Sequence, residues 1–296
     1  MSRRNSIQGM ELRGDQLRWV VLTMGDRSGQ LEKAMQSLTS ETGVARPIIV
    51  NNGGGTHPLL EFPSAGVIEL SENLGVPGGR DLGMRSSDSI IVGFLDDDAA
   101  LSGGPERIIE AFEADPGLGV VALRLVDEDG ETARRHLPRV GSEGSSVGGE
   151  VAYFLGGACA IRRSAYEEVG GYFTELFYGH EEIELSWRLI DAGWSIRYLA
   201  DVEVFHPRTE ISRHAEGWFM TGRNRVWIAR RTLPWTVALV HVTFWLAAGA
   251  ARAPKGDCRS GYLRGWWSGW RGQIDHRPIR WSTVWKLTRL GRPPVI

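Results

Sequence analysis

Cysteine is scarce in this chain of 296 residues, which has only two, Cys159 and Cys258. They lie far apart and outside any CxxC pair, which argues against a disulfide framework or a cysteine-rich zinc site. The N-terminus lacks the apolar run of a signal peptide, because residues 1–16 are mostly polar or charged. We therefore expect a cytoplasmic protein in which Cys159 is a small buried apolar residue.

A dinucleotide-binding fingerprint is also missing. The end of the first apolar run and the turn after it, residues 23–29, read TMGDRSG and contain no GxGxxG pattern. A nicotinamide cofactor rests its pyrophosphate on such a glycine-rich turn after the first strand. The sequence therefore argues against an NAD-dependent oxidoreductase.

Charge is distributed unevenly, although the net charge is only −2. Residues 206–296 hold 16 Lys and Arg against four Asp and Glu, about +12, whereas residues 1–205 hold 18 against 32, about −14. Nine of the twelve Trp lie after residue 217. This asymmetry predicts two regions, an acidic domain over residues 1–210 and a basic, Trp/Arg-rich C-terminal region over residues 211–296.

Apolar runs of strand length alternate with segments of helical periodicity in the acidic region. We expect strands at residues 18–24, 46–52, 66–70 and 89–95, helices at 29–39 and near 79–86, a helix from about Glu181 and two short strands within 194–207. This alternation predicts an α/β fold with a mostly parallel, Rossmann-like sheet covered by helices on both faces. Residues 127–150, rich in Gly and Ser, are expected to form a loop or hairpin near the site. From Glu216 onward the pattern is helical.

Three consecutive acids, Asp96, Asp97 and Asp98, directly follow the apolar run at 89–95. Ligands of open α/β sheets bind at the carboxyl ends of the strands, and clustered carboxylates there suit a hard divalent cation such as Mg²⁺ or Mn²⁺. Such a cation would neutralise the diphosphate of a nucleotide. The triplet alone leaves two interpretations open, a metal site and three solvated loop acids.

A glycine-rich segment, ENLGVPGGRDLGMR at residues 72–85, precedes the expected helix near 79–86. Its glycines come before Arg80, so backbone N–H groups and a guanidinium could face a phosphate. The segment does not match GxGxxG, and a simple turn is the alternative.

The helix expected within residues 177–194 carries four acidic or basic side chains of interest. Glu182 shares a face with two leucines, and partial desolvation on an apolar face raises the pKa of a carboxyl and suits a general base. Glu184 and Arg188 are spaced to form an i, i+4 ion pair. Glu181 could serve the chemistry of the site, or it could simply interact favourably with the positive end of the helix dipole at the N-terminus.

The order of these segments resembles an inverting family 2 glycosyltransferase with the GT-A fold. That family shows a VDNGS-like strand end, ENxGxxxxxNxG, FLDDD, a glycine-rich stretch containing RR and VGG, a GED-like helix start and a terminal His. The matching segments here are Val50–Gly53, Glu72–Gly83, Phe94–Asp98, Gly156–Gly171, His180–Leu185 and His206. The resemblance covers roughly residues 18–210, and six motifs in order are far more specific than any one of them.

The resemblance implies a role for each matching residue. Asp98 would bind the metal, Asp96 the metal or the ribose, and His206 matches a position that completes the metal shell in some relatives. Glu182 stands at the position of the catalytic base, with Glu181 as the alternative. The residues implied to contact the donor are Thr23, Asp26, Asn51, Asn73, Arg80, Asp96 and Asp97, and those implied to contact the acceptor are Gly156, Gly157, Ala158 and Trp187.

Departures from the family pattern leave the donor base open. Asn51 replaces the acid that usually contacts uracil, Asp81 replaces a motif asparagine, and Glu182 replaces an aspartate with a side chain one methylene longer. A UDP-sugar is the first expectation, with GDP or dTDP as alternatives. Arg162 and Arg163 could reach the diphosphate.

The implied reaction is a single displacement that inverts the anomeric configuration. Glu182 takes the proton of an acceptor hydroxyl, whose oxygen attacks C1 of the sugar while the metal stabilises the leaving diphosphate. A nucleotidyltransferase also uses paired acids, but the glutamate-bearing helix and the Gly156–Gly171 stretch favour glycosyl transfer. A non-catalytic, membrane-associated binding module on a degenerate fold is the other alternative, against which the acids argue.

The C-terminal region contains a long uncharged segment, residues 233–251, flanked by arginines. As a helix it would span ~28 Å, close to the ~30 Å of a bilayer core. It could be a core or dimer-interface helix, an interfacial membrane helix or a true span; Trp beside Arg is typical of an interfacial anchor. Peripheral contact with the inner face of the cell membrane and a homodimer therefore stay open. The acceptor could be a glycan, a lipid-linked sugar or a small molecule, and no nucleic-acid partner is expected.

Overall fold

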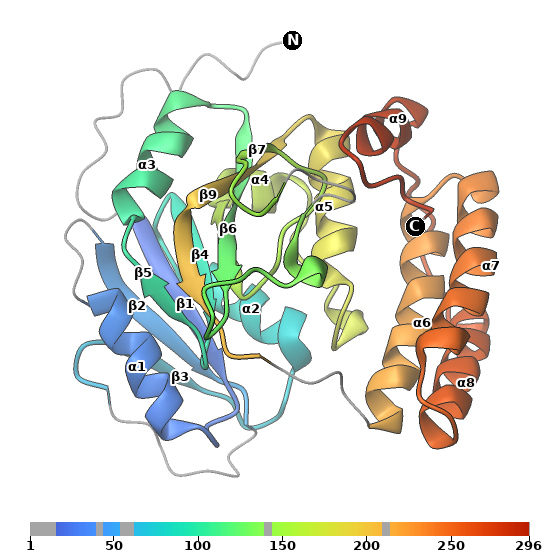
Figure 1. Ribbon diagram of the computed structural model, residues 1–296, viewed down its shortest axis with the longest axis horizontal. Coiled ribbons are helices and arrows are strands. Elements are labelled where there is room, and N and C mark those ends of the chain that lie inside the picture. Colours follow the sequence, from blue (N-terminus) through green and yellow to red (C-terminus); the bar gives the residue numbers. More distant parts are fainter. Residues whose placement is uncertain (1–15, 40–43, 54–61, 139–143, 209–213, 296) are drawn as a thin grey trace.

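The computed structural model describes residues 16–39, 44–53, 62–138, 144–208 and 214–295. A central sheet carries helices on both faces, and a group of helices from the C-terminal end of the chain lies along one side (Figure 1). The chain therefore has the α/β class predicted from the sequence, with a helical C-terminal region beside it.

The sheet is mixed. Its strands are β1 (Leu17–Thr23), β2 (Val44–Asn51), β3 (Gly66–Glu69), β4 (Ile91–Asp96), β5 (Ala100–Ser102), β6 (Leu118–Val126), β7 (Gly149–Glu150), β8 (Ala158–Arg162) and β9 (Ser195–Phe205). Their order is β3-β2-β1-β4-β8-β6-β9-β5, with β7 paired to β9. Strands β3, β2, β1 and β4 run parallel, as does the β6–β9 pair, whereas β8, β5 and β7 run antiparallel to their neighbours. The parallel share is smaller than predicted, because the described residues between β6 and β8 form no crossover helix of the kind that joins parallel strands.

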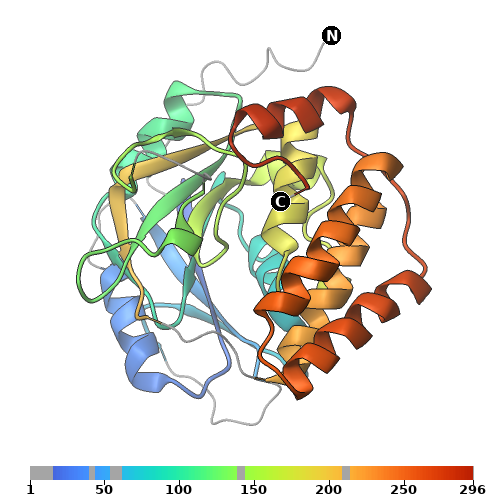
Figure 2. The same cartoon turned by 45° about the vertical axis from the view of Figure 1, so that its right-hand side comes forward.

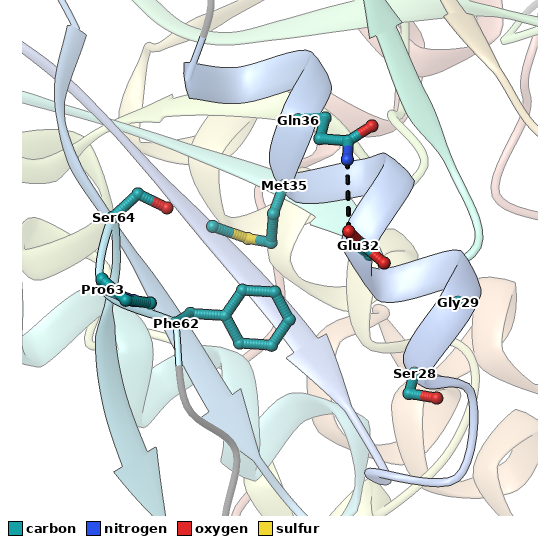
Figure 3. Close-up of a pocket in the computed structure, with 8 residues that line it drawn as sticks. All are labelled: Ser28, Gly29, Glu32, Met35, Gln36, Phe62, Pro63 and Ser64. Carbon is teal, nitrogen blue, oxygen red and sulfur yellow. Dashed lines mark hydrogen bonds between the residues drawn. The ribbon is translucent and has the colours of Figure 1, made fainter.

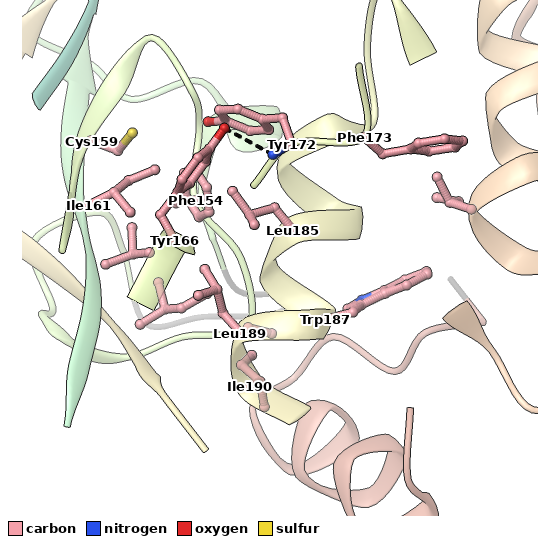
Figure 4. Close-up of a cluster of buried hydrophobic side chains, with 14 of the residues drawn as sticks. Phe154, Cys159, Ile161, Tyr166, Tyr172, Phe173, Leu185, Trp187, Leu189 and Ile190 are labelled. Carbon is pink, nitrogen blue, oxygen red and sulfur yellow. Dashed lines mark hydrogen bonds between the residues drawn. The ribbon is translucent and has the colours of Figure 1, made fainter. Parts of the chain in front are cut away.

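Helices cover both faces of the sheet. The described residues form the helices α1 (Ser28–Thr39), α2 (Gly75–Arg85), α3 (Pro105–Ala114), α4 (Arg163–Glu168), α5 (Glu181–Ala192), α6 (Ala215–Thr232), α7 (Trp235–Arg252), α8 (Asp257–Arg271) and α9 (Trp281–Arg289), with 3-10 turns η1 (Arg134–His136) and η2 (Thr174–Leu176). On one face, Leu31 of α1 and Phe112 of α3 join a buried cluster with Trp19 of β1. On the other face, Leu185 and Leu189 of α5 join the cluster drawn in Figure 4.

The start of α2 differs from the sequence expectation, which placed a glycine-rich turn before the helix. The glycines lie inside the helix, because α2 already begins at Gly75. Gly79 and Gly83 face β1, where added Cβ atoms would collide with the side chains of Leu22 and Val20. These glycines allow a close approach of helix and strand, a packing requirement that helix propensity does not report.

The two short strands expected within 194–207 form one strand, β9. Its pairing with β6 jumps from Leu199 to Glu203, so residues 200–202 form a bulge that interrupts the pairing within one continuous strand. The polar segment 127–150 contains η1 and the short strand β7 as well as loop, and its residues 139–143 lie outside the described part.

The C-terminal helices lie beside α5 (Figure 2), and their buried side chains belong to the same hydrophobic cluster as those of α5. Helices α6 and α8 approach closely because Gly222, Gly261 and Gly265 leave no room for a Cβ beside the facing backbone. Between α5 and α7, the ring of Trp187 meets the ring of His241 edge-on, with ring centroids 6.0 Å apart. The predicted boundary near residue 210 falls outside the described residues, so the division into two domains stays a prediction. Within the described ranges, no helix combines the length and apolar content needed to cross a membrane.

Candidate active site

Two aspartates and a histidine meet at the carboxyl edge of the sheet. Asp96 ends β4, Asp98 follows it, and His206 follows β9. Each offers one ligand atom, and these atoms lie within 4.8 Å of one another. His206 Nδ1 lies 2.8 Å from the Pro207 carbonyl, and a proton donated there would leave the Nε2 lone pair available to a cation. Two carboxylate oxygens and one imidazole nitrogen form a donor set that fits a divalent metal.

The acids next to this group have partners of their own. Asp98 pairs with Arg27 at 2.8 Å, and the buried Asp97 accepts a hydrogen bond from Thr23 Oγ1 at 2.6 Å. Burial raises the pKa of Asp97 to about 6, although the Thr23 hydroxyl and Arg27 act to lower it. Thr23 and Asp97, both implied donor contacts, therefore contact each other and join β1 to the end of β4. The sequence reading missed Arg27, which lies in the turn after β1 and outside the family motifs.

A buried guanidinium connects Asp96 to two glutamates. Arg80 lies 3.1 Å from a carboxylate oxygen of Asp96, 3.3 Å from Glu181 and 3.2 Å from Glu182. Burial acts to lower the pKa of Arg80, but Asp96 and then the glutamates outweigh it, and the net pKa is raised. The arginine expected to face a phosphate thus lies among carboxylates at the centre of the site.

The two glutamates at the start of α5 differ in burial. Glu182 is 20% exposed, and its Oε1 accepts a hydrogen bond from the Gly156 N–H at 3.1 Å. Glu181 is buried, and its Oε2 has no hydrogen-bond partner among the described residues. Burial, reinforced by the charge of Glu182, raises the pKa of Glu181 to about 8. The sequence suggested partial desolvation of Glu182, whereas in the structure Glu181 is the buried carboxyl and Glu182 the accessible one.

The small residues at the start of β8 are packed against the site's own side chains. A Cβ on Gly156 would overlap the Arg80 guanidinium, and a Cβ on Gly157 would overlap the Asp96 carboxylate. Ala158 is fully buried. Contact of these three residues with an acceptor stays a prediction, and the structure supplies a packing reason for their small size.

The remaining implied donor residues lie at the ends of β1 and β2 and in the segment before α2. Asn51 ends β2, and its side-chain amide donates to Glu69 of β3 at 2.6 Å. Asn73 Oδ1 accepts the Gly75 N–H at 2.7 Å, and Asp26 is exposed in the loop after β1. Glu69 thus places a carboxylate beside the position where Asn51 replaces an acid. The sequence analysis did not identify Glu69, because this residue lies between two family motifs.

Two arginines lie at the wrong end of the sheet for the role suggested by sequence. Arg162 pairs with Ile91 at the start of β4, five residues before Asp96. Its guanidinium donates to backbone carbonyls at the end of α3 and the start of β6, and Arg163 donates to the Ser87 carbonyl. The expectation that these arginines reach a diphosphate is wrong, because their side chains satisfy backbone at the opposite edge.

Two residues singled out in the sequence, Trp187 and Cys159, belong to the core. Trp187 is buried and points from α5 toward the C-terminal helices, where it meets His241 (Figure 4). Cys159 is fully buried in β8, as expected. The resemblance implied an acceptor contact for Trp187, and the burial of its ring in the core argues against that contact.

The loop that leads into α5 is fastened by the C-terminal region. Phe177 and His180 in this loop have positive φ angles, 62° and 75°, which side chains other than glycine adopt at a cost. The buried Asn224 of α6 places its amide nitrogen 2.8–3.0 Å from three carbonyl oxygens of residues 176–179. Asn224 therefore stabilises the strained approach to Glu181 and Glu182. No motif marked it, because it lies beyond the region of resemblance.

A second contact joins α5 to α6. The fully buried carboxylate of Glu184 accepts hydrogen bonds from Arg188 at 2.7 Å and from Arg231 at 3.1 Å. The first contact confirms the ion pair predicted from i, i+4 spacing, and the second could not be predicted from local sequence. Together they fix the first turn of α5, which carries the accessible glutamate, against the C-terminal helices.

A hollow of about 500 Å³ lies elsewhere, between α1 and residues 62–64 (Figure 3). Its lining shares no residue with the acid cluster. Glu32 is the one ionisable side chain in this lining, and it accepts a hydrogen bond from Gln36 at 3.4 Å. The grouping of chemistry-bearing side chains places the candidate site at the carboxylates instead.

The whole fold is similar to that of solved glycosyltransferases with the GT-A architecture. GalNAc-T7 with UDP, GalNAc and Mn²⁺ matches with a TM-score of 0.60 at 15% identity, covering 88% of this chain and 55% of that one. TarS 1–349 of S. aureus in complex with UDP matches with a TM-score of 0.56 at 11% identity, covering 88% and 92%. The GT-A fold predicted from the sequence is thereby confirmed.

Sequence comparison identifies the family. Residues 20–170 match glycosyl transferase family 2, and the chain belongs to this family. A pre-mycofactocin glycosyltransferase of Mycobacterium tuberculosis is 27% identical over 228 residues, which cover 72% of this chain and 44% of the relative. The chain thus spans less than half the length of that relative.

Proposed function

We propose that the protein is a metal-dependent, inverting glycosyltransferase that moves a sugar from a nucleotide diphosphate to an acceptor hydroxyl. The observation that carries this proposal is the contact of Arg80 with both Asp96 and Glu182. This contact joins the proposed metal ligand Asp96 to the proposed base Glu182 through one guanidinium at the carboxyl edge of the sheet. A leaving group and an attacking hydroxyl could be served there at the same time.

The metal would be held by Asp96, Asp98 and His206. When bound, Mg²⁺ or Mn²⁺ would neutralise the charge that develops on the leaving diphosphate. An imidazole ligand makes Mn²⁺ the better match of the two, since Mg²⁺ prefers oxygen ligands alone. The presence of UDP and Mn²⁺ together in the GalNAc-T7 structure supports this assignment.

Glu182 would act as the base that takes the acceptor proton. Its hydrogen bonds from the Gly156 N–H and the Arg80 guanidinium orient the carboxylate. Glu181 would stay buried and protonated beside it. A single displacement with an oriented base inverts the configuration at C1.

Donor and acceptor are specified only by class. We propose a UDP-sugar first, because Glu69 supplies a carboxylate beside Asn51, and TarS was solved with UDP. GDP and dTDP sugars are the alternatives. The acceptor is a glycan, a lipid-linked sugar or a small molecule.

The test is a melting-temperature panel. A ligand that binds only the folded chain raises its melting temperature. We expect one of UDP-, GDP- or dTDP-sugars to raise it in the presence of Mn²⁺, and EDTA to abolish the shift. A shift that survives EDTA contradicts metal dependence, and no shift from any of the three contradicts the donor class.

A further inference from the structure

The outer faces of α7 and α8 expose an unusual number of large hydrophobic side chains. Nine of the thirteen exposed large hydrophobic residues in the described part of the chain lie on α7, α8 and α9. On α7, Leu239 is 62% exposed, and Val240 and Phe244 are exposed beside it. These three lie within one and a half turns and share an outward face, opposite the buried Val242 and His241.

Helix α8 extends this apolar face. Leu263, Trp267 and Trp270 are exposed, and Trp267 is 58% exposed. Trp266 stacks against Trp267, meets Trp270 edge-on and donates a hydrogen bond to the Val242 carbonyl of α7. The exposed tryptophans therefore lie on the side of α8 that turns toward α7. We call the six exposed residues Leu239, Val240, Phe244, Leu263, Trp267 and Trp270 the α7–α8 surface.

Basic side chains surround the α7–α8 surface. Arg252 ends α7, Lys255 follows it, and Arg264 and Arg271 are exposed on α8. Asp257, in the first turn of α8, is the one acid in these two helices. The whole region 206–296 carries a net charge of about +12.

From this combination we infer that the α7–α8 surface docks the protein peripherally on an anionic lipid bilayer. Tryptophan and leucine enter the boundary between headgroups and acyl chains, while Arg and Lys reach the anionic headgroups. Each basic residue near an anionic leaflet adds attraction that salt weakens. The surface lies on other helices than the proposed catalytic residues, so docking does not depend on the proposed reaction.

A second copy of the chain is the main competing occupant of this surface. Two copies joined face to face would bring their basic rims together, and like charges across an interface oppose association. An anionic bilayer has the complementary sign. Charge therefore favours the lipid surface, and self-association becomes an outcome to test.

The experiment is co-sedimentation of the full chain with vesicles, without substrate. One set is neutral phosphatidylcholine alone, and the other contains about 30% phosphatidylglycerol, an anionic lipid. We expect binding to the anionic vesicles alone, and release when salt rises from about 50 mM to about 500 mM. Leu239→Glu should weaken binding about tenfold or more, because it replaces inserted apolar area with a charge. Arg271→Gln should weaken it about fivefold.

Matched controls distinguish an effect at the α7–α8 surface from a general effect of added negative charge and from loss of folding. Val147→Glu makes the same change at a residue 42% exposed on the sheet domain, and it should leave binding within twofold of the parent chain. Trp267→Glu provides a second variant on α8, and melting curves confirm that each variant is folded. Equal binding to neutral vesicles, no binding to either set, or equal loss in Val147→Glu would overturn the inference. So would a concentration-dependent dimer that Leu239→Glu converts to monomer while vesicle binding persists.

Discussion

Glu181 and Glu182, adjacent at the start of α5, lie in different environments. Glu182 is accessible and oriented by the Gly156 N–H and Arg80, whereas Glu181 is buried with a pKa raised to about 8. A buried neutral acid cannot accept a proton at neutral pH, and an accessible carboxylate can. The structure therefore supports the choice between the two glutamates that the family motif alone left open.

Kinetics of two conservative variants test this assignment. Glu182→Gln should retain donor binding and lower kcat by roughly 10²–10⁴-fold, the usual contribution of a general base. Glu181→Gln preserves the shape and neutrality of the buried group, so it should lower kcat by less than about tenfold. Release of the nucleotide diphosphate from the donor chosen by the melting panel measures both. If Glu181→Gln is inactive and Glu182→Gln is active, the proposed base is the wrong one of the two glutamates.

The raised pKa of Glu181 also predicts a pH dependence of stability. Its ordinary value is 4.5, and the folded value is about 8, so the folded chain holds a proton that the unfolded chain releases between these pH values. The contribution of Glu181 is complete below about pH 4.5 and is lost as pH rises through about 8, with a slope of at most ~1.4 kcal/mol per pH unit.

Urea unfolding from about pH 5 to about pH 8 measures this slope. Glu181→Gln cannot release the proton, so its stability should fall less steeply with rising pH than that of the parent chain. Glu113→Gln, at an exposed position of α3, should follow the parent curve. Identical slopes in the parent chain and in Glu181→Gln would show that the carboxyl is already ionised in the folded state.

At the scale of elements, the local apolar pattern predicted the strands and helices whose formation depends on that pattern. Strands β1 to β4 and helices α1 and α5 follow apolar periodicity, and the structure has each of them within a few residues of the expected bounds. The start of α2 was misjudged because Gly79 and Gly83 meet β1, a contact between distant segments. The antiparallel direction of β8 follows from the route of a long loop, which no periodicity encodes.

Helix α6 contributes to the site through a buried amide, which yields a prediction for Asn224. Asn224→Ala would remove the two N–H donors of an amide that contacts three carbonyls of residues 176–179, and it should destabilise the fold by about 1–3 kcal/mol. It should also lower kcat more than it alters donor affinity, because the loop positions Glu182. Urea unfolding and steady-state kinetics report the two effects.

A surface amide in the same region serves as the control. Gln273→Ala, at an exposed position after α8, should stay within about 0.5 kcal/mol of the parent chain. If Asn224→Ala is equally mild, the loop before α5 holds its conformation without α6, and the positioning role is lost.

At the scale of the whole molecule, the sequence predicted that the acids and His206 belong to one site, but it revealed only some of the residues that contact them. Six ordered motifs brought the carboxylates, the glutamates and the histidine to one edge of the sheet, where the structure places them. Arg27 and Asn224 escaped notice because they act through contacts between segments far apart in sequence. Arg162 was misplaced because its motif position does not reveal the end of the sheet at which a strand finishes.

An ion pair also joins the sheet and its helices to the basic C-terminal helices. Arg231 of α6 reaches the buried Glu184 of α5, so opposite charges meet at the junction of the two regions. The same basic region carries the α7–α8 surface on its outer side. The C-terminal helices therefore have two faces, one that packs against α5 and one that is proposed to meet lipid.

The central claim is metal-dependent binding of a nucleotide diphosphate at Asp96, Asp98 and His206, and calorimetric titration tests it most directly. UDP, GDP and dTDP are titrated with Mn²⁺ into the parent chain, into Asp98→Asn and into Asp88→Asn, an exposed acid paired with Arg18. One nucleotide should bind the parent chain and Asp88→Asn alike, and at least about tenfold more weakly to Asp98→Asn, because a charged metal ligand is lost. EDTA should abolish the binding. Affinity that is unchanged in EDTA and in a folded Asp98→Asn variant would contradict the account.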